Sequence, residues 1–272
     1  MINVIATDID GTFFSDDDQF DRLGFQAQLA EMNHRQMHFI AASSNHLDHL
    51  VKIFADFNGP ISYVANNGGH VVNEQGQTIA EQPVSSRQWH QIVAWLTQQG
   101  QLPAARIILI GEHGTYTEVP ASDQFFQAAG YFYDDLQSIA NINAVSDKVY
   151  KLDITCGDFN VAPIYQGLQQ QFGHQVNVVM SGLNGIDIMA NGVSKLSGIE
   201  VLLNTWQLPL TQVAAFGDND NDYEMLTGVG HGLAMKNAAP NLLKRYPHLT
   251  KWDNNHDGVT RSISDILRNQ EH

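Results

Sequence analysis

Short apolar runs alternate with helical patterns in the N-terminal part of the chain, and a polar cluster follows each run. Residues 2–7, 37–42 and 61–65 are rich in β-branched or other apolar side chains, which is typical of buried strands. Between them, residues 22–35 and 46–56 carry apolar side chains at helical spacing. This alternation of strand and helix predicts right-handed βαβ units and a parallel sheet.

The pattern changes in the middle of the chain. From about residue 84 to residue 183 the expected strands follow one another more closely, as in an α+β domain. The first pattern then returns, with strands at 185–189, 213–216 and 232–235 and helices that begin at 195 and 223. We therefore expect an α/β core with a Rossmann-like parallel sheet and helices on both faces, formed by residues 1–83 and 185–272. An α+β domain is expected as an insertion at 84–184.

Length and composition agree with a folded protein of two domains. The chain has 272 residues, of which 43% are hydrophobic and 16% are charged, and a domain takes about 150 residues. A single cysteine, Cys156, excludes an internal disulfide framework, as expected in a reducing cytoplasm. The first residues lack the basic start of a signal peptide, and no apolar run is long enough for a membrane-spanning helix. We expect a cytoplasmic protein that is a monomer or a small homo-oligomer.

The net charge limits the class of partner. Lys and Arg number 14 and Asp and Glu number 29, which gives a formal charge of −15 at pH 7. Such an acidic surface repels nucleic-acid phosphates and anionic lipids, so we expect neither nucleic acid nor membrane as a partner. A small anionic substrate is compatible with this charge if a metal ion or a lysine neutralises it locally.

Two carboxylates follow the first expected strand. Asp8 and Asp10 belong to the sequence Asp-Ile-Asp-Gly-Thr, directly after residues 2–7. Both can face one pocket only if the alternation of the strand ends there, and Gly11 permits such a bend. One carboxylate can then act as a nucleophile and the other as a general acid and base. The alternative is a turn with two solvated acids.

A second acidic motif follows the strand expected at 213–216. It has the sequence Gly-Asp-Asn-Asp-Asn-Asp at 217–222, which in isolation could be a solvated loop. Because ligands bind beyond the carboxyl ends of parallel strands, we expect Asp218 and Asp222 near the first two carboxylates. Carboxylate oxygens are ligands for a hard divalent cation, so this edge of the sheet is a candidate Mg²⁺ site.

Lys195 and Ser43 add groups that suit a phosphate. Lys195 opens the helix expected at 195–206 and can supply the cation that an acidic site needs to hold a phosphate. The alternative is an exposed helical lysine. Ser43 lies between an expected strand and an expected helix. Its hydroxyl and the neighbouring backbone N–H groups can bind phosphate oxygens, or the hydroxyl can cap the helix.

In this order the motifs resemble those of the haloacid dehalogenase superfamily of phosphatases. The likeness spans essentially the whole chain and is closest to the Cof-type sugar phosphatases, whose large inserted αβ cap matches residues 84–184. It is carried by Asp-Ile-Asp-Gly-Thr at 8–12, Phe-Ile-Ala-Ala-Ser-Ser-Asn at 39–45, Asn-Asn-Gly-Gly at 66–69, Gly-Val-Ser-Lys at 192–195, Gly-Asp-x-x-Asn-Asp at 217–222 and Asp-Asn-Asn-His-Asp-Gly-Val at 253–259. The resemblance implies a haloacid dehalogenase core and a cap domain that selects the substrate.

The resemblance also implies a role for each motif residue. Asp8 would attack phosphorus and form an aspartyl-phosphate, while Asp10 would protonate the leaving alcohol and later deprotonate the hydrolytic water. Mg²⁺ would be held by the Asp8 carboxylate, the Asp10 backbone carbonyl and the Asp218 carboxylate, with Asp222 as a further ligand or a support behind the ligands. The residues that would bind the transferring phosphoryl group are Ser43, Lys195 and Asn221.

Two segments depart from the family pattern. Where the family often has Thr-Gly-Arg, this chain has Ser-Ser-Asn at 43–45, so the hydroxyl is kept but an arginine contact to substrate is absent. Where the family often has Glu-Asn-Gly, this chain has Asn-Asn-Gly at 66–68, so the glutamate is absent.

Together the motifs predict a Mg²⁺-dependent phosphatase that acts on small phosphorylated metabolites, with sugar phosphates as the first expectation. A phosphomutase of the same fold and a non-catalytic protein that binds a phosphorylated ligand are the alternatives. A signalling receiver domain fits poorly, because it is a single domain and its phosphorylated aspartate lies in mid-chain.

Overall fold

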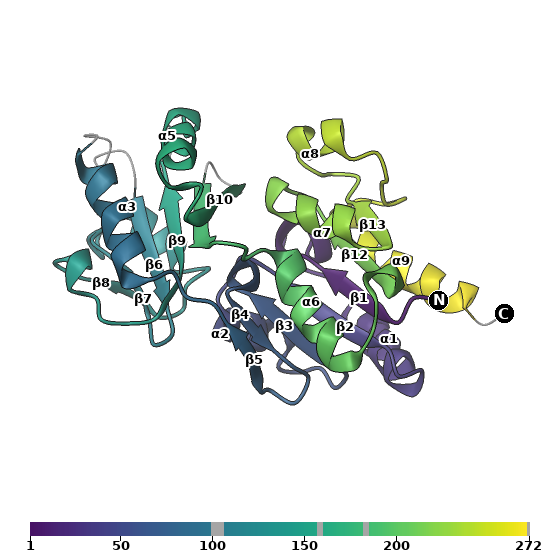
Figure 1. The fold of residues 1–272 in the computed structure, drawn as a ribbon. Coiled ribbons are helices and arrows are strands. Elements are labelled where there is room, and N and C mark those ends of the chain that lie inside the picture. The colour runs from purple at the N-terminus through teal and green to yellow at the C-terminus, as the bar shows by residue number, and fades with distance from the viewer. Residues whose placement is uncertain (99–105, 157–159, 182–184, 271–272) are drawn as a thin grey trace. The chain divides into compact units, whose positions relative to one another are not determined.

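The chain folds into two compact units (Figure 1). The computed structural model describes residues 1–98, 106–156, 160–181 and 185–270. The first unit comprises Met1–Ala80 and Ser194–His272, and the second comprises Glu81–Val193. Within the described ranges, no helix is both long enough and apolar enough to span a membrane.

The first unit is built around a 7-stranded sheet. Its strands are β1 (Val4–Thr7), β2 (His38–Ala42), β3 (Ile61–Ala65), β4 (His70–Val72), β5 (Thr78–Glu81), β12 (Val213–Gly217) and β13 (His231–Ala234). Their order in the sheet is β13-β12-β1-β2-β3-β4-β5. Neighbouring strands are parallel from β13 to β3, and β4 runs antiparallel to β3. The central strand β1 is buried along its whole length, which explains its uninterrupted apolar sequence.

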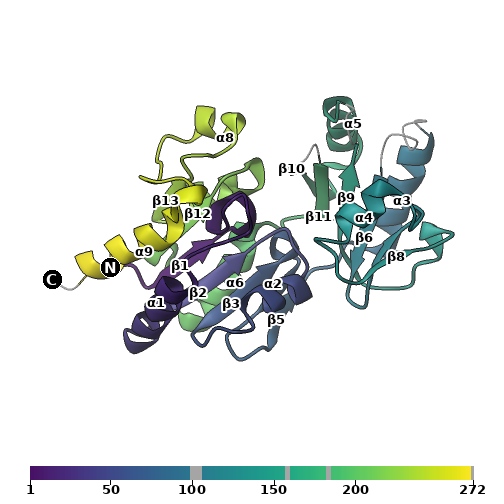
Figure 2. The same cartoon turned by 180° about the vertical axis from the view of Figure 1, so that it is seen from behind.

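Helices cover both faces of this sheet. They are α1 (Arg22–His34), α2 (Leu47–Phe54), α6 (Lys195–Trp206), α7 (Tyr223–Gly228), α8 (Pro240–Arg245) and α9 (Gly258–Asn269). Helices α6 and α7 pack together on the face turned to the viewer in Figure 1, whereas α1, α2 and α9 lie on the face that Figure 2 shows. The α/β class with helices on both faces of a largely parallel sheet is therefore confirmed.

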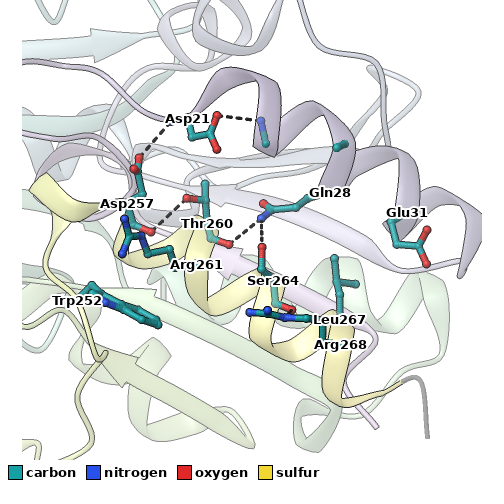
Figure 3. Close-up of a pocket in the computed structure, with 12 residues that line it drawn as sticks. Asp21, Gln28, Glu31, Trp252, Asp257, Thr260, Arg261, Ser264, Leu267 and Arg268 are labelled. Atoms are coloured by element: carbon teal, nitrogen blue, oxygen red, sulfur yellow. Dashed lines mark hydrogen bonds between the residues drawn. The ribbon is translucent and has the colours of Figure 1, made fainter.

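Gln28 joins α1 to α9 on the face of the sheet that Figure 2 shows. From α1, its Nε2 donates a hydrogen bond to the Thr260 carbonyl oxygen at 2.7 Å and another to Ser264 Oγ at 2.8 Å, both on α9 (Figure 3). A groove of about 720 Å³ runs between these helices. None of the residues that line it is among the site residues expected from the sequence.

The second unit contains a 6-stranded sheet. Its strands are β6 (Arg106–Gly111), β7 (Thr115–Thr117), β8 (Leu136–Ser138), β9 (Val149–Thr155), β10 (Val176–Ser181) and β11 (Gly185–Ala190), and its helices are α3 (Ser86–Gln98), α4 (Gln124–Ala129) and α5 (Ala162–Phe172). The strand order is β10-β11-β9-β6-β7-β8. Side chains alternate between the faces: Ile107 and Leu109 join the core under α3 and α5, whereas Ile108 and Ile110 pack with Tyr133.

The structure corrects the expected place of one strand. The segment at 185–189 was expected in the α/β core, but as β11 it pairs antiparallel with β10 and β9 in the second sheet. Its apolar run and its position before a helix fit either sheet, and periodicity does not reveal a strand's partners. The two units consequently divide at 80/81 and 193/194, rather than at the expected 83/84 and 184/185.

Several short or peripheral elements were not expected. These are β4, β5, β8, α8 and α9. Strands β4 and β5 extend the sheet at one edge, where β4 runs antiparallel to β3. Both strands are short enough that their sequences resemble a loop.

Candidate active site

The residues expected from the sequence lie at the carboxyl ends of the parallel strands in the first unit. Asp8 follows β1, Ser43 follows β2, and Asp218 follows β12. Lys195 is the first residue of α6, and the others lie in the turns after β1 and β12, namely Asp10, Asn221 and Asp222. The fold thus brings together residues that stand up to 214 positions apart in the sequence (222 − 8).

The chain leaves β1 through a tight turn that places Asp8 beside β12. The Asp8 N–H donates to the Phe216 carbonyl oxygen at 2.9 Å, and the irregular turn Ile9–Phe13 follows. Gly11 has a φ of +74°, and a Cβ at this position would lie 2.8 Å from Asp218 Oδ2. The positive φ favours glycine here, and a side chain at this position would also crowd the Asp218 carboxylate.

Lys195 joins two carboxylates in the interior. Its Nζ lies 2.6 Å from Asp8 Oδ1 and 2.6 Å from Asp222 Oδ1, and its side chain is fully buried. The second oxygen of Asp222 accepts hydrogen bonds from the backbone N–H groups of Asp218 at 2.8 Å and Asn219 at 2.9 Å. Asp222 therefore fixes both the lysine and the loop that carries Asp218.

Burial and like charge raise the pKa of the carboxyl groups. Burial raises the pKa of Asp8 well above its ordinary value, against the opposing effect of Lys195. Burial also raises the pKa of Asp10, although Asn45 opposes this shift with a hydrogen bond. Burial and the nearby Asp222 raise the pKa of Asp218 to about 6. The cluster thus contains more carboxyl groups than one ammonium group can neutralise.

The surrounding carboxylates also shift the pKa of Lys195. Burial lowers the pKa of Lys195, but the carboxylates of Asp222 and Asp8 more than compensate, so the net shift is upward. Lys195 consequently remains a cation despite full burial.

The donor set fits a divalent cation. One carboxylate oxygen from each of Asp8, Asp218 and Asp222 lies within 4.8 Å of the others. Thr12 Oγ1 donates to Asp218 Oδ1 at 3.0 Å and so orients that carboxylate. Oxygen donors and excess negative charge suit Mg²⁺. Because both oxygens of Asp222 already accept hydrogen bonds, Asp8 and Asp218 are the better candidates for direct ligands.

Asn45 connects Ser43 with Asp10. Its side-chain Nδ2 donates to Asp10 Oδ2 at 2.7 Å, while its backbone N–H donates to Ser43 Oγ at 3.0 Å. Ser43 is fully buried. Asn45 stands where the family often has arginine, and a lone asparagine in the sequence gives no signal for this contact.

Asn221 contacts a residue that the sequence analysis did not select. Its Nδ2 donates to Asn67 Oδ1 at 3.2 Å, and Asn67 is almost completely buried in the turn after β3. The available signal was the polar Asn-Asn-Gly-Gly sequence behind an apolar strand, at the same edge of the sheet as the other motifs.

The C-terminal part of the chain holds the turn after β1. Asn237 Nδ2 donates to the Gly11 carbonyl oxygen at 2.8 Å, and Asn254 Nδ2 donates to the Phe14 carbonyl oxygen at 3.1 Å. Asn254 also donates to Asp16 Oδ1 at 2.9 Å and, together with Asn255, lowers the pKa of Asp16. The motif at 253–259 thus contacts the turn that carries Asp10.

Comparisons with known proteins identify the family of this chain. A family model described as haloacid dehalogenase-like hydrolase matches residues 5–263. The 5-amino-6-(5-phospho-D-ribitylamino)uracil phosphatase YbjI of Escherichia coli is 30% identical over 269 residues, covering 99% of this chain and 97% of the relative. The HMP-PP phosphatase of Citrobacter koseri is 27% identical, covering 92% and 90%. The crystal structure of SMU.1108c from Streptococcus mutans superposes with a TM-score of 0.92 at 26% identity, covering 98% of this chain and all of that one.

Proposed function

The chain belongs to the family of haloacid dehalogenase-like hydrolases, and on this premise we propose that it is a Mg²⁺-dependent phosphatase of small phosphorylated metabolites. The observation that carries the proposal is the position of Asp8. This buried carboxylate lies at the end of the central strand, 2.6 Å from the Lys195 ammonium and within reach of a cation held with Asp218. It is the nucleophile of the proposed reaction.

Asp8 and Asp10 divide the covalent chemistry between them. A carboxylate oxygen of Asp8 attacks phosphorus, the bond from phosphorus to the substrate oxygen breaks, and Asp10 gives its proton to the departing alcohol. Water then attacks the aspartyl-phosphate, Asp10 takes a proton from that water, and the Asp8–phosphorus bond breaks to release phosphate. Burial shifts the pKa of Asp10 upward, which is the direction that favours a general acid.

The remaining residues neutralise and position the phosphoryl group. Phosphoryl transfer depends mostly on positioning and on neutralising the phosphoryl oxygens. Lys195 supplies a buried cation, and Ser43 and Asn221 supply hydrogen-bond donors. Asp8, Asp218 and the Asp10 backbone carbonyl would hold Mg²⁺, with Asp222 supporting Asp218 and Lys195 from behind. When bound, Mg²⁺ neutralises negative charge on the phosphoryl oxygens and on the Asp8 carboxylate.

The second unit is proposed to select the substrate. All the residues proposed for the chemistry belong to Met1–Ala80 and Ser194–His272, so the part of the substrate beyond the phosphate must be distinguished elsewhere. The relatives named above are phosphatases of different phosphorylated compounds, which supports a shared chemistry with a variable specificity. We propose a sugar phosphate or a similar polar phosphomonoester as the substrate.

A phosphate-release assay with and without Mg²⁺ tests the proposal. Incubated with a panel of sugar phosphates and with p-nitrophenyl phosphate, the protein should release inorganic phosphate only when Mg²⁺ is present. Transfer of the phosphoryl group within the substrate, without free phosphate, would identify a mutase. Binding of phosphorylated ligands without either reaction would identify a non-catalytic binding protein.

A further inference from the structure

The turn after β3 has an unusual backbone. Three successive residues adopt positive φ angles: Asn66 at +51°, Asn67 at +55° and Gly68 at +101°. Glycine and asparagine are the residues that best tolerate this region, and a run of three is rare. Such conformations persist only where the surrounding structure imposes them, and they occur often at functional sites.

The glycine of this turn is required by a close approach to α6. A Cβ on Gly68 would lie 2.2 Å from the Ser194 carbonyl oxygen, which no side chain can tolerate. Ser194 is the N-cap of α6 and directly precedes Lys195. The turn therefore packs against the start of the helix that carries the buried lysine.

The same turn is bonded to the loop after β2. The Asn66 N–H donates to the Asn45 carbonyl oxygen at 2.9 Å, and the Asn67 N–H donates to the Ser43 carbonyl oxygen at 2.9 Å. These backbone bonds fix the distance between the turn and the residue whose hydroxyl is proposed to bind phosphate.

The two asparagine side chains differ in their contacts. Asn67 Oδ1 accepts the hydrogen bond from Asn221 Nδ2 at 3.2 Å. The Asn66 amide is also fully buried, but neither of its polar atoms has a hydrogen-bond partner among the described residues. An unsatisfied buried amide is costly, so Asn66 is suited to this position by its tolerance of a positive φ rather than by its side-chain bonds.

We infer that Asn67 is a positioning residue, which holds the Asn221 amide in the orientation that the phosphoryl group requires. The turn Asn66–Gly68 places it there by contacting the segments that carry Ser43 and Lys195. This inference rests on the proposed function, because it takes Asn221 to be a phosphoryl-binding residue.

The matched substitutions Asn67→Gly and Asn66→Gly test this role. Glycine keeps the left-handed backbone at either position and removes one buried amide. Only Asn67→Gly removes the acceptor for Asn221. Each variant, the wild type and Asn221→Ala should be titrated with inorganic phosphate in the presence of Mg²⁺, by calorimetry and as a competitive inhibitor of p-nitrophenyl phosphate hydrolysis.

The expected result is a difference between the two glycine variants. Asn67→Gly should weaken phosphate binding about three- to tenfold, as expected from the loss of one neutral hydrogen bond, and should raise KM more than it lowers kcat. Asn221→Ala should weaken binding about 10- to 100-fold, because its bond is to a charged group. The double variant Asn67→Gly/Asn221→Ala should bind phosphate no worse than Asn221→Ala alone, since the inferred effect of Asn67 on phosphate binding passes through Asn221. Asn66→Gly should stay close to the wild type.

Two results would overturn the inference. One is equal phosphate affinity in the two glycine variants, and the other is a double variant whose loss is the product of the single losses. The wild type could also bind phosphate, and the variants could show the expected order of affinities, without hydrolysis of any phosphate ester. That result would refute the proposed function and leave the positioning role of Asn67 intact. A wild type that does not bind phosphate would refute the positioning role as well.

Discussion

Each of the two units contains a buried lysine among aspartates, but the two clusters are built differently. In the first unit, Lys195 binds both Asp8 and Asp222. These three residues come from three separate segments of the chain. In the second unit, Lys151 Nζ lies 3.3 Å from Asp187 Oδ1, with side chains 2% and 1% exposed. Both lysine side chains therefore lie where water has almost no access.

The second cluster follows from the register of one antiparallel pair. Asp187 on β11 stands opposite Asp153 on β9, and Lys151 lies two residues before Asp153 on the same face. Tyr133 OH donates to Asp153 Oδ2 at 2.7 Å, and Thr155 Oγ1 donates to Asp153 Oδ1 at 3.1 Å. Two hydroxyl groups thus donate to the Asp153 carboxylate.

The two clusters differ in how many carboxyl groups accompany each lysine. In the second unit, neighbouring strands bring the charged residues together and hydroxyl groups donate to one of the two carboxylates, Asp153. In the first unit, four carboxyl groups surround one ammonium group, and the pKa of Asp8, Asp10 and Asp218 is raised. The first cluster therefore has the larger excess of carboxyl groups over lysine, four to one against two to one for Asp153 and Asp187 beside Lys151. Carboxyl groups with raised pKa values of this kind are frequent at active sites.

The largest expected effect is on phosphatase turnover, which a substitution in the first cluster should reduce and one in the second cluster should not. Asp8→Asn should reduce Mg²⁺-dependent turnover of p-nitrophenyl phosphate by at least about 10³-fold, because it removes the nucleophile and a ligand charge together. The corresponding change in the second unit, Asp187→Asn, should alter this turnover little. Steady-state phosphate release measures both. Appreciable activity in Asp8→Asn would remove Asp8 from the role of nucleophile.

The next prediction distinguishes two carboxylates within the first cluster. Asp10→Asn keeps the backbone carbonyl and should still bind Mg²⁺, while turnover falls about 10²- to 10⁴-fold through the loss of general acid–base catalysis. A sugar alkoxide needs protonation on departure more than p-nitrophenolate does, so single-turnover rates should fall more with the sugar phosphate. An equal loss in the first step with both substrates would show that Asp10 is not the acid.

A third prediction concerns stability. Removing one partner of a buried ion pair typically costs about 3–5 kcal/mol, because the other charge stays buried without compensation. Lys195→Met and Lys151→Met should both lower the free energy of unfolding by about this amount in denaturant titrations. Only Lys195→Met should also abolish phosphate release.

The double variant Lys151→Met/Asp187→Asn is the control for that prediction. It removes both charges of the pair and should recover much of the stability that Lys151→Met loses, with turnover of p-nitrophenyl phosphate retained. Loss of that turnover in a stable double variant would show that the second cluster also contributes to the chemistry.

The smallest expected effect is stabilisation by the metal. A ligand that binds only the folded protein stabilises it by about 2.7 kcal/mol at 100 times its dissociation constant. Mg²⁺ should therefore raise the unfolding temperature of the wild type and of Asp187→Asn. In Asp218→Asn, which lacks a proposed ligand, the rise should disappear. A rise that persists in Asp218→Asn but vanishes in Asp187→Asn would place the cation in the second unit.

Much of the fold could be predicted because its signals are local. The apolar run of β1, the helical spacing of α1 and the N-terminal lysine of α6 lie within short windows of sequence. The site residues could be predicted for a related reason, since the carboxyl ends of parallel strands converge at one edge and Asp8 and Asp218 follow such ends. The strand β11 was assigned to the wrong sheet. Its place depends on its pairing with β9 and β10, and the pattern of apolar residues along a sequence does not show which strands pair.

The α/β order, the inserted segment and the residues that gather at the sheet's edge follow from the sequence alone, since each depends on local spacing or on strand ends. Which atoms meet is known only from the folded structure. It showed that Lys195 joins Asp8 to Asp222, that Asn45 supports Asp10 and that Asn67 holds Asn221. These contacts join residues between 27 and 187 positions apart, and no local preference for strand, helix or turn specifies such a pairing.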